Sequence, residues 1–64
     1  MRPLTELNKV IASQGRFKTW IALKMEWSYS SLVQSLNGHY IPPNDKVIEL
    51  CEVLGVDPAP YLRK

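Results

Sequence analysis

Apolar residues recur along the chain at helical spacing, and glycines separate the apolar stretches. Leu4, Leu7 and Ile11 fall at positions i, i+3 and i+7, which is the spacing of one face of an α-helix. Gly15 follows, and glycine suits the left-handed residue that ends many helices. The pattern predicts a first helix over residues 3–13.

The next apolar residues predict a second, shorter helix. Phe17, Ile21 and Met25 step by four residues, so in a helix over residues 17–25 they share the inner face. The start of this helix is weak, because neither Arg16 nor Phe17 is a good N-cap.

A third helix is predicted over residues 29–37. Ser28 offers a side-chain oxygen to the free N–H groups of its first turn. Leu32 and Leu36 follow at i+4 and i+8 from that serine, on one face. The closing Asn-Gly pair ends the helix, because both residues accept a positive φ.

A fourth helix, over residues 43–54, and a last short one, over 58–62, complete the pattern. The fourth helix begins after the extended connector HYIPP and stops at Gly55, and Asp57 is the predicted N-cap of the last one. The buried face of the fourth helix is predicted to be Val47, Leu50, Cys51 and Leu54. Together these elements predict an all-α bundle of five short helices without strands.

The second and third predicted helices have a distinctive relation. Only Glu-Trp-Ser separates them, so the third helix must leave at a steep angle, which is a helix-turn-helix geometry. Its outward side chains are then Tyr29, Ser30 and Gln34. In the DNA major groove, hydroxyls bond to several base edges, and a glutamine amide pairs with N6 and N7 of adenine.

Length and composition exclude several classes of protein. A chain of 64 residues indicates one domain, over residues 1–64, with little room for an enclosed catalytic pocket. Cys51 is the only cysteine, and with His39 it supplies too few ligands for a structural zinc site. The sequence shows no metal cluster, phosphate-binding loop or acid–base pair, so we expect neither an enzyme nor a cofactor.

The net charge of +2 is unevenly distributed. Residues 1–41 are basic and residues 42–62 are acidic, so a polyanion would be steered to one side of the molecule. The sequence has no run as long as a membrane span, and its start lacks the apolar core of a secretory signal. We therefore expect a cytoplasmic protein, intact from Met1, that does not associate with membranes.

Three pieces of the chain together carry a family resemblance. They are the stretch IALKMEWSYSSLVQSLNG, Pro42 in the connector after it, and the stretch VIELCEVLGVDPAPYL. In order and spacing they resemble the Leu-Ala-x-x-x-Gly-x-Ser to Asn-Gly signature, the loop proline and the terminal helices of the Cro and repressor type of helix-turn-helix domain, also called the XRE type. The resemblance covers residues 17–62.

The resemblance implies a lambda-repressor-like fold and a set of contacts with DNA. The base-contacting residues it implies are Tyr29, Ser30 and Gln34, with Ser31 and Val33 at the margin. The phosphate-contacting residues it implies are Lys18, Ser28, Asn37, Gly38, His39 and Tyr40. Phosphate contacts position such a domain, whereas base contacts specify the sequence that it reads.

The chain departs from the family pattern at several positions. Glu26 stands where the family usually has glycine in the turn, so the turn has either a strained positive φ or a different geometry. Phe17 stands where a threonine or serine cap is common. Ser35 and Asn44 stand where an apolar residue is usual, whereas Trp27 matches an apolar core position.

These observations predict a sequence-specific transcriptional regulator, a small phage or bacterial repressor of the Cro kind that acts by occupying its operator. We expect a homodimer on double-stranded DNA, bound to an inverted repeat with half-sites about 34 Å apart. The alternative is a protein-binding module on the same fold, such as an antirepressor or polymerase-binding factor, with an aromatic patch at Trp20, Tyr29 and Tyr40. Trp20 packs either in such a patch or against the first helix.

Overall fold

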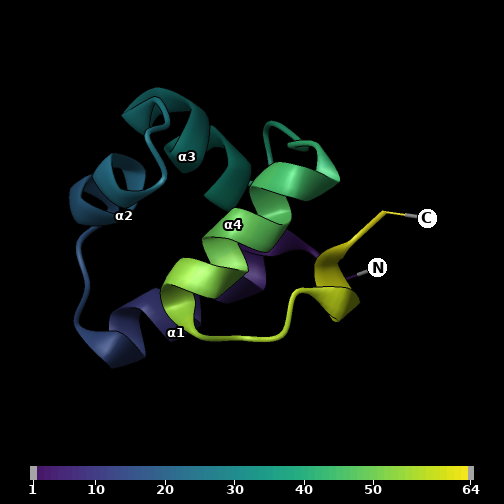
Figure 1. Cartoon of the computed structure of the whole chain (residues 1–64), viewed down its shortest axis with the longest axis horizontal. Coiled ribbons are helices and arrows are strands. Elements are labelled where there is room, and N and C mark those ends of the chain that lie inside the picture. Colours follow the sequence, from purple (N-terminus) through teal and green to yellow (C-terminus); the bar gives the residue numbers. More distant parts are fainter. Residues whose placement is uncertain (1, 64) are drawn as a thin grey trace.

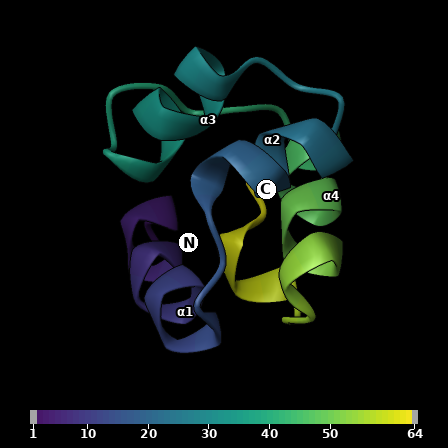
Figure 2. The same ribbon diagram turned by 90° about the vertical axis from the view of Figure 1, so that its left-hand side faces the viewer.

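The computed structural model describes residues 2–63, in which α-helices and 3₁₀ turns follow one another without a strand. In chain order the elements are a 3₁₀ turn Leu4–Glu6, α1 Leu7–Gln14, α2 Lys18–Lys24, α3 Tyr29–Leu36, α4 Asn44–Leu54 and a 3₁₀ turn Ala59–Tyr61. Figure 1 shows α4 crossing the front of the molecule, and Figure 2 shows α1 and α4 on opposite sides with α2 and α3 above them. The predicted all-α class is confirmed.

The first predicted helix is confirmed in its core but not in its start. Leu4, Leu7 and Ile11 are buried, as their spacing predicted. Gly15, with φ of 66°, ends α1 in the left-handed region. The first turn is 3₁₀ and not α-helical, with Pro3 as its extended N-cap.

The prediction that Phe17 belongs to the core is wrong. Its side chain is 76% exposed, although four-residue spacing placed it on the inner face with Ile21. Phe17 is the N-cap of α2 with extended backbone, at φ −96° and ψ 141°, so the helical periodicity does not reach it. Ile21, Ala22 and Met25 form the buried face of α2. The predicted weakness of the cap is confirmed, since no side chain caps α2.

Residues 25–28 form the turn between α2 and α3, and this turn contains a residue with a strained backbone dihedral angle. Glu26 has φ of 52°, the one positive φ at a non-glycine position within residues 2–63. The Trp27 N–H donates to the Ala22 carbonyl at 2.9 Å, and the Glu26 N–H donates to Leu23 at 3.1 Å. This is the Schellman arrangement, in which glycine usually occupies the left-handed position. Trp27 is half-buried and packs against the core, as predicted.

The connector to α4 and α4 itself follow the prediction closely. Gly38 takes the positive φ, at 83°, whereas Asn37 before it keeps a helical φ of −91°. Pro42 in the connector is buried. The four residues predicted for the inner face of α4 are all buried: Val47, Leu50, Cys51 and Leu54. Gly55, at φ of 74°, ends the helix.

The C-terminal segment is a single 3₁₀ turn where a fifth helix was predicted. The Asp57 carboxylate accepts a hydrogen bond from the Ala59 N–H at 3.1 Å, so it stabilises the start of this turn. The side chain of Asn44 then holds Arg63, donating to its carbonyl at 2.8 Å and accepting from its N–H at 2.9 Å. Asn44 therefore has a polar structural role where the family usually places an apolar residue.

Ser35 is the polar residue that the core contains. Its side chain is 1% exposed, between the buried Leu32 and Leu36 on α3. The hydroxyl donates to the carbonyl of Ser31 at 2.8 Å, one turn earlier in the same helix. This local hydrogen bond satisfies the hydroxyl and makes its burial tolerable.

None of the helices within residues 2–63 is long and apolar enough to cross a membrane.

Candidate nucleic-acid interface

The outward face of α3 is polar and carries no charge. Leu32, Ser35 and Leu36 lie on the buried side of the helix. At 100° per residue the opposite side is centred on Ser30 and Gln34, which are both exposed. A helix that exposes short neutral polar groups can donate and accept hydrogen bonds without an electrostatic preference of its own.

The remaining predicted base-contacting residues border this face. Tyr29, in the first turn of α3, is 50% exposed. Val33 lies one turn beyond Tyr29 and is half-buried, and Ser31 on the other border is also half-buried. Their partial burial fits the marginal position expected for both. The start of α3 is fixed by Ser28, whose hydroxyl oxygen accepts from the Ser31 N–H at 3.3 Å.

An open groove of about 620 Å³ runs between α1, the start of α2 and the two ends of α3. Its lining residues are Asn8, Ile11, Ala12, Arg16, Phe17, Lys18, Thr19, Tyr29 and Asn37. Three of the predicted DNA-contacting residues, Lys18, Tyr29 and Asn37, thus meet in one groove although they are distant in sequence. The lining contains two cations and no carboxylate.

The other predicted phosphate-contacting residues are not in this groove. Gly38 and Tyr40 line a separate cavity of about 160 Å³, together with residues from the first 3₁₀ turn. His39 is exposed, and its backbone N–H donates to the Gln34 carbonyl at 2.9 Å. The Ser28 hydroxyl is engaged in the helix cap. The predicted phosphate contacts therefore divide between two places on the surface.

Asn8 is a residue of the groove that the sequence analysis missed. Its Nδ2 donates to the carbonyl of Leu36 at 2.8 Å and so joins α1 to the end of α3. Its Oδ1 is buried and has no hydrogen-bond partner among the described residues. An asparagine next to the apolar Leu7 in a predicted helix was the available signal, because asparagine is a weak helix former that needs a local reason.

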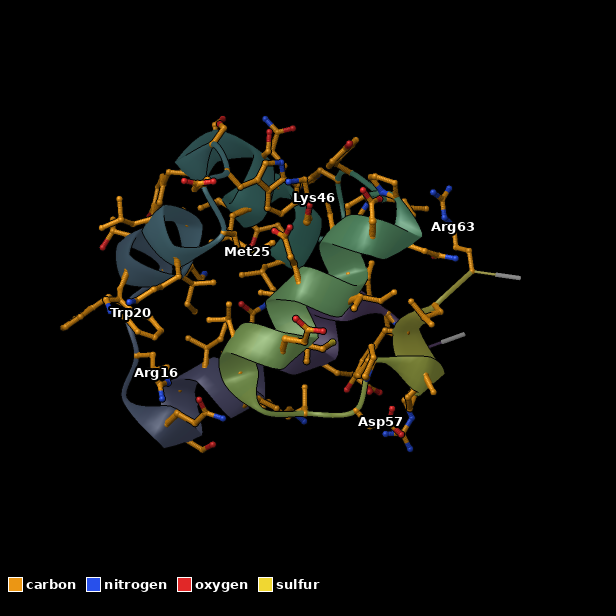
Figure 3. The ribbon with its side chains drawn as sticks, viewed as in Figure 1. Arg16, Trp20, Met25, Lys46, Asp57 and Arg63 are labelled. Atoms are coloured by element: carbon orange, nitrogen blue, oxygen red, sulfur yellow. The ribbon has the colours of Figure 1, made fainter. Side chains whose placement is uncertain are left out.

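Two cationic side chains lie over the indole ring of Trp20. The guanidinium carbon of Arg16 lies 4.5 Å from the ring centroid and the ammonium of Lys24 lies 5.5 Å from it. Figure 3 shows Arg16 directly beneath Trp20 at the start of α2. Gln14 also accepts from Arg16 Nε at 2.9 Å and donates to the Leu54 carbonyl at 2.6 Å. Trp20 is half-buried and packs against the core, whereas Tyr29 and Tyr40 line two different cavities.

Positive charge on and before α2 is not neutralised by ion pairs. Within residues 2–63 the ion pairs are Arg2 with Glu6 at 3.7 Å and Lys46 with Glu49 at 3.8 Å. Among the described residues, no carboxylate therefore pairs with Arg16 and Lys18 of the groove or with Lys24 at the end of α2. On α4 the opposite charge prevails, because Asp45, Glu49 and Glu52 are exposed there.

The described residues hold no group of three metal-ligating side chains. Cys51 is buried in the core, as predicted, and burial together with the nearby charge of Asp57 raises the pKa of its thiol.

No protein-family model, curated protein or solved structure matches this chain. The neutral face of α3 and the basic groove beside it are therefore the features that point to a ligand.

Proposed function

We propose that this protein is a sequence-specific DNA-binding regulator of the Cro and repressor helix-turn-helix type, which acts by occupying its operator. The observation that carries the proposal is the exposed neutral face of α3, centred on Ser30 and Gln34, beside a groove lined by cations. Base edges require neutral donors and acceptors, whereas the phosphate backbone requires cations.

The geometry between α2 and α3 supports the helix-turn-helix assignment. The turn occupies only residues 25–28, and α2 and α3 pack more extensively on each other than any other two elements of the described chain. Glu26, where the family usually has glycine, adopts the left-handed φ that explains a glycine preference. The strained residue therefore stands at the position the resemblance predicts for a left-handed turn.

Each proposed contact follows from side-chain chemistry. The amide of Gln34 pairs with N6 and N7 of adenine, and the hydroxyl of Ser30 bonds to several base edges. Lys18 at the start of α2 and Asn37 at the end of α3 line the groove and bind the phosphates on that side. These phosphate contacts hold α3 in register without contributing sequence information.

One α3 helix reads only a few base pairs, so the proposed regulator binds as a homodimer to an inverted repeat. Half-site centres on one face of the duplex lie about 34 Å apart. The folded chain measures 28 × 22 × 18 Å. The half-site spacing therefore exceeds the longest dimension of the Cα trace, so each copy can lie over its own half-site.

Selection from random duplex DNA, repeated at two salt concentrations, tests the proposal directly. We expect an enriched inverted repeat with half-sites one helical turn apart and an affinity that falls steeply with salt. Replacing Gln34 with Ala should cost about 1–3 kcal/mol of binding free energy and relax one base position. Selection without enrichment, or a Q34A variant with unchanged preference, would reject α3 as the reader.

A protein partner is the second candidate. Tyr40 and Ile41 are 42% and 56% exposed, and both line the smaller cavity of about 160 Å³ beside the first 3₁₀ turn. Aromatic residues are enriched at protein interfaces. Under this reading, Ile41→Ala weakens partner binding and Gln34→Ala leaves it intact. Under the DNA-binding reading, Gln34→Ala weakens DNA binding and Ile41→Ala leaves it intact.

A further inference from the structure

Phe17 is a residue whose identity the fold does not explain. It is the N-cap of α2, a position at which serine, threonine, aspartate and asparagine stabilise a helix by accepting a hydrogen bond. A phenyl ring accepts none, and this ring is 76% exposed, so it adds little to the core. The fold would be better served by a small polar residue here.

The surroundings of Phe17 differ from those of the exposed aliphatic residues. Phe17 lines the basic groove between Arg16 and Lys18, and Tyr29 of α3 lines the same groove. Leu23 is equally exposed, at 76%, but does not belong to the groove. Phe17 is thus an apolar surface in a groove that also contains two cations and borders the proposed reading helix.

We propose that Phe17 is a DNA-binding residue whose ring packs against a deoxyribose of the strand that lies in this groove. The inference rests on the proposed function and extends it to an apolar contact with the backbone. A DNA strand alternates phosphates, which are anionic, with sugars that expose C–H groups. The groove offers a partner for each, because its lining combines the Phe17 ring with the cations Arg16 and Lys18.

Duplex DNA is the occupant that the charge and position of the groove favour. The groove has no carboxylate in its lining, so an anionic strand enters without repulsion. Tyr29 and Asn37 connect it to both ends of α3. A duplex engaged by the outward face of α3 therefore brings one of its backbones alongside Phe17.

The substitution Phe17→Ser separates the proposed role from a structural one. Serine restores a helix cap, so we expect the melting temperature to rise, by about 4–8 °C. Loss of the apolar contact should at the same time weaken binding to operator and random duplexes alike, by about fivefold to tenfold. The salt dependence of binding should stay unchanged, because no charge is removed.

Two matched variants complete the experiment. Leu23→Ala removes an equally exposed apolar side chain outside the groove and should leave binding unchanged. Lys18→Ala removes a charge within the groove. The plot of log affinity against log salt should therefore become less steep, with the magnitude of its slope reduced by about 1.

An F17S variant that binds as tightly as the wild type, or loses no more affinity than L23A, overturns the inference and assigns the groove to another occupant. In that case the wild type still selects an operator, and the proposed function stands. A wild-type protein that selects no duplex at all overturns both.

Discussion

Helices α3 and α4 bury similar faces and differ in what they expose to solvent. Leu32 and Leu36 on α3 are fully buried, as is Leu50 on α4. On the outer side, α4 carries exposed carboxylates, and α3 carries no charged residue along its whole length. The two helices are therefore comparable as parts of the core and unlike as parts of the surface.

The difference concerns how a helix keeps its outer side hydrated. Charged side chains are the usual solution, and α4 uses it. Carboxylates on α3 would repel a phosphate backbone, whereas hydroxyl and amide groups leave the helix free to approach one. The proposed DNA contact explains why α3 lacks the charges that α4 has.

The largest expected effect concerns the property that the two helices share. Leu32→Ala and Leu50→Ala each remove a fully buried side chain and should lower the free energy of unfolding by about 2–5 kcal/mol. Urea denaturation followed by circular dichroism measures both. Gln34→Ala is the matched control on the outer side of α3 and should stay within about 0.5 kcal/mol of the wild type. A comparable loss for Q34A would contradict the assignment of the two faces.

Exchanging the outer surfaces of the helices tests their difference. Gln34→Glu gives α3 a carboxylate like those of α4, and should weaken DNA binding by about 1–3 kcal/mol through loss of the amide donor and repulsion of phosphate. Glu52→Gln makes the opposite change on α4 and should leave sequence preference unchanged. Gel-shift titration at fixed salt compares the two. If Glu52→Gln strengthens binding by as much as Gln34→Glu weakens it, with no change in sequence preference in either, then only net charge matters.

The turn that precedes α3 can be relaxed in the same way. Glu26→Gly removes the strain of a positive φ at a non-glycine residue, and we expect a stabilisation of about 1 kcal/mol. Gly55→Ala provides the mirror experiment at the end of α4. Its φ is 74° and a Cβ there would meet no neighbouring atom, so backbone strain alone should cost about 1 kcal/mol. Thermal melting of both variants should give shifts of opposite sign.

The smallest effect is a pH dependence that belongs to α4. Burial, and then the charge of Asp57, raises the pKa of the Cys51 thiol in the folded chain. The folded state therefore holds this proton more tightly, so stability is unaffected below the unfolded pKa of about 8.5. It falls as the pH rises from there through the folded pKa. Urea titrations at neutral and alkaline pH should show this loss in the wild type, and Cys51→Ala should reduce it.

Periodicity predicted the buried leucines of α1, α3 and α4 because those residues lie within regular helix. It failed at Phe17, since an N-cap has extended backbone and its side chain leaves in a direction that helical phase does not describe. Periodicity also could not distinguish the first and last 3₁₀ turns from α-helix, because the same spacing fits both kinds of helix over one turn.

The candidate site was predictable only in part. The outward direction of Ser30 and Gln34 followed from Leu32, since all three lie in one helix. The groove depends instead on how α1 packs against the ends of α3, which Asn8 fixes through a long-range hydrogen bond. The contact between the Arg16 guanidinium and the Trp20 ring likewise depends on Arg16, which precedes α2, folding back over that helix. Contacts of this kind have no periodic signature.

The two ends of the described chain are tied together. The Arg2 N–H donates to the Pro60 carbonyl at 2.7 Å, and Asn44 holds Arg63 through its side chain. In Figure 1 both ends lie on the side of the molecule opposite α2. A linker that joins two copies in tandem would therefore start and end on this side of the molecule, away from α2. Such a single-chain dimer would bind an operator without the concentration dependence of assembly.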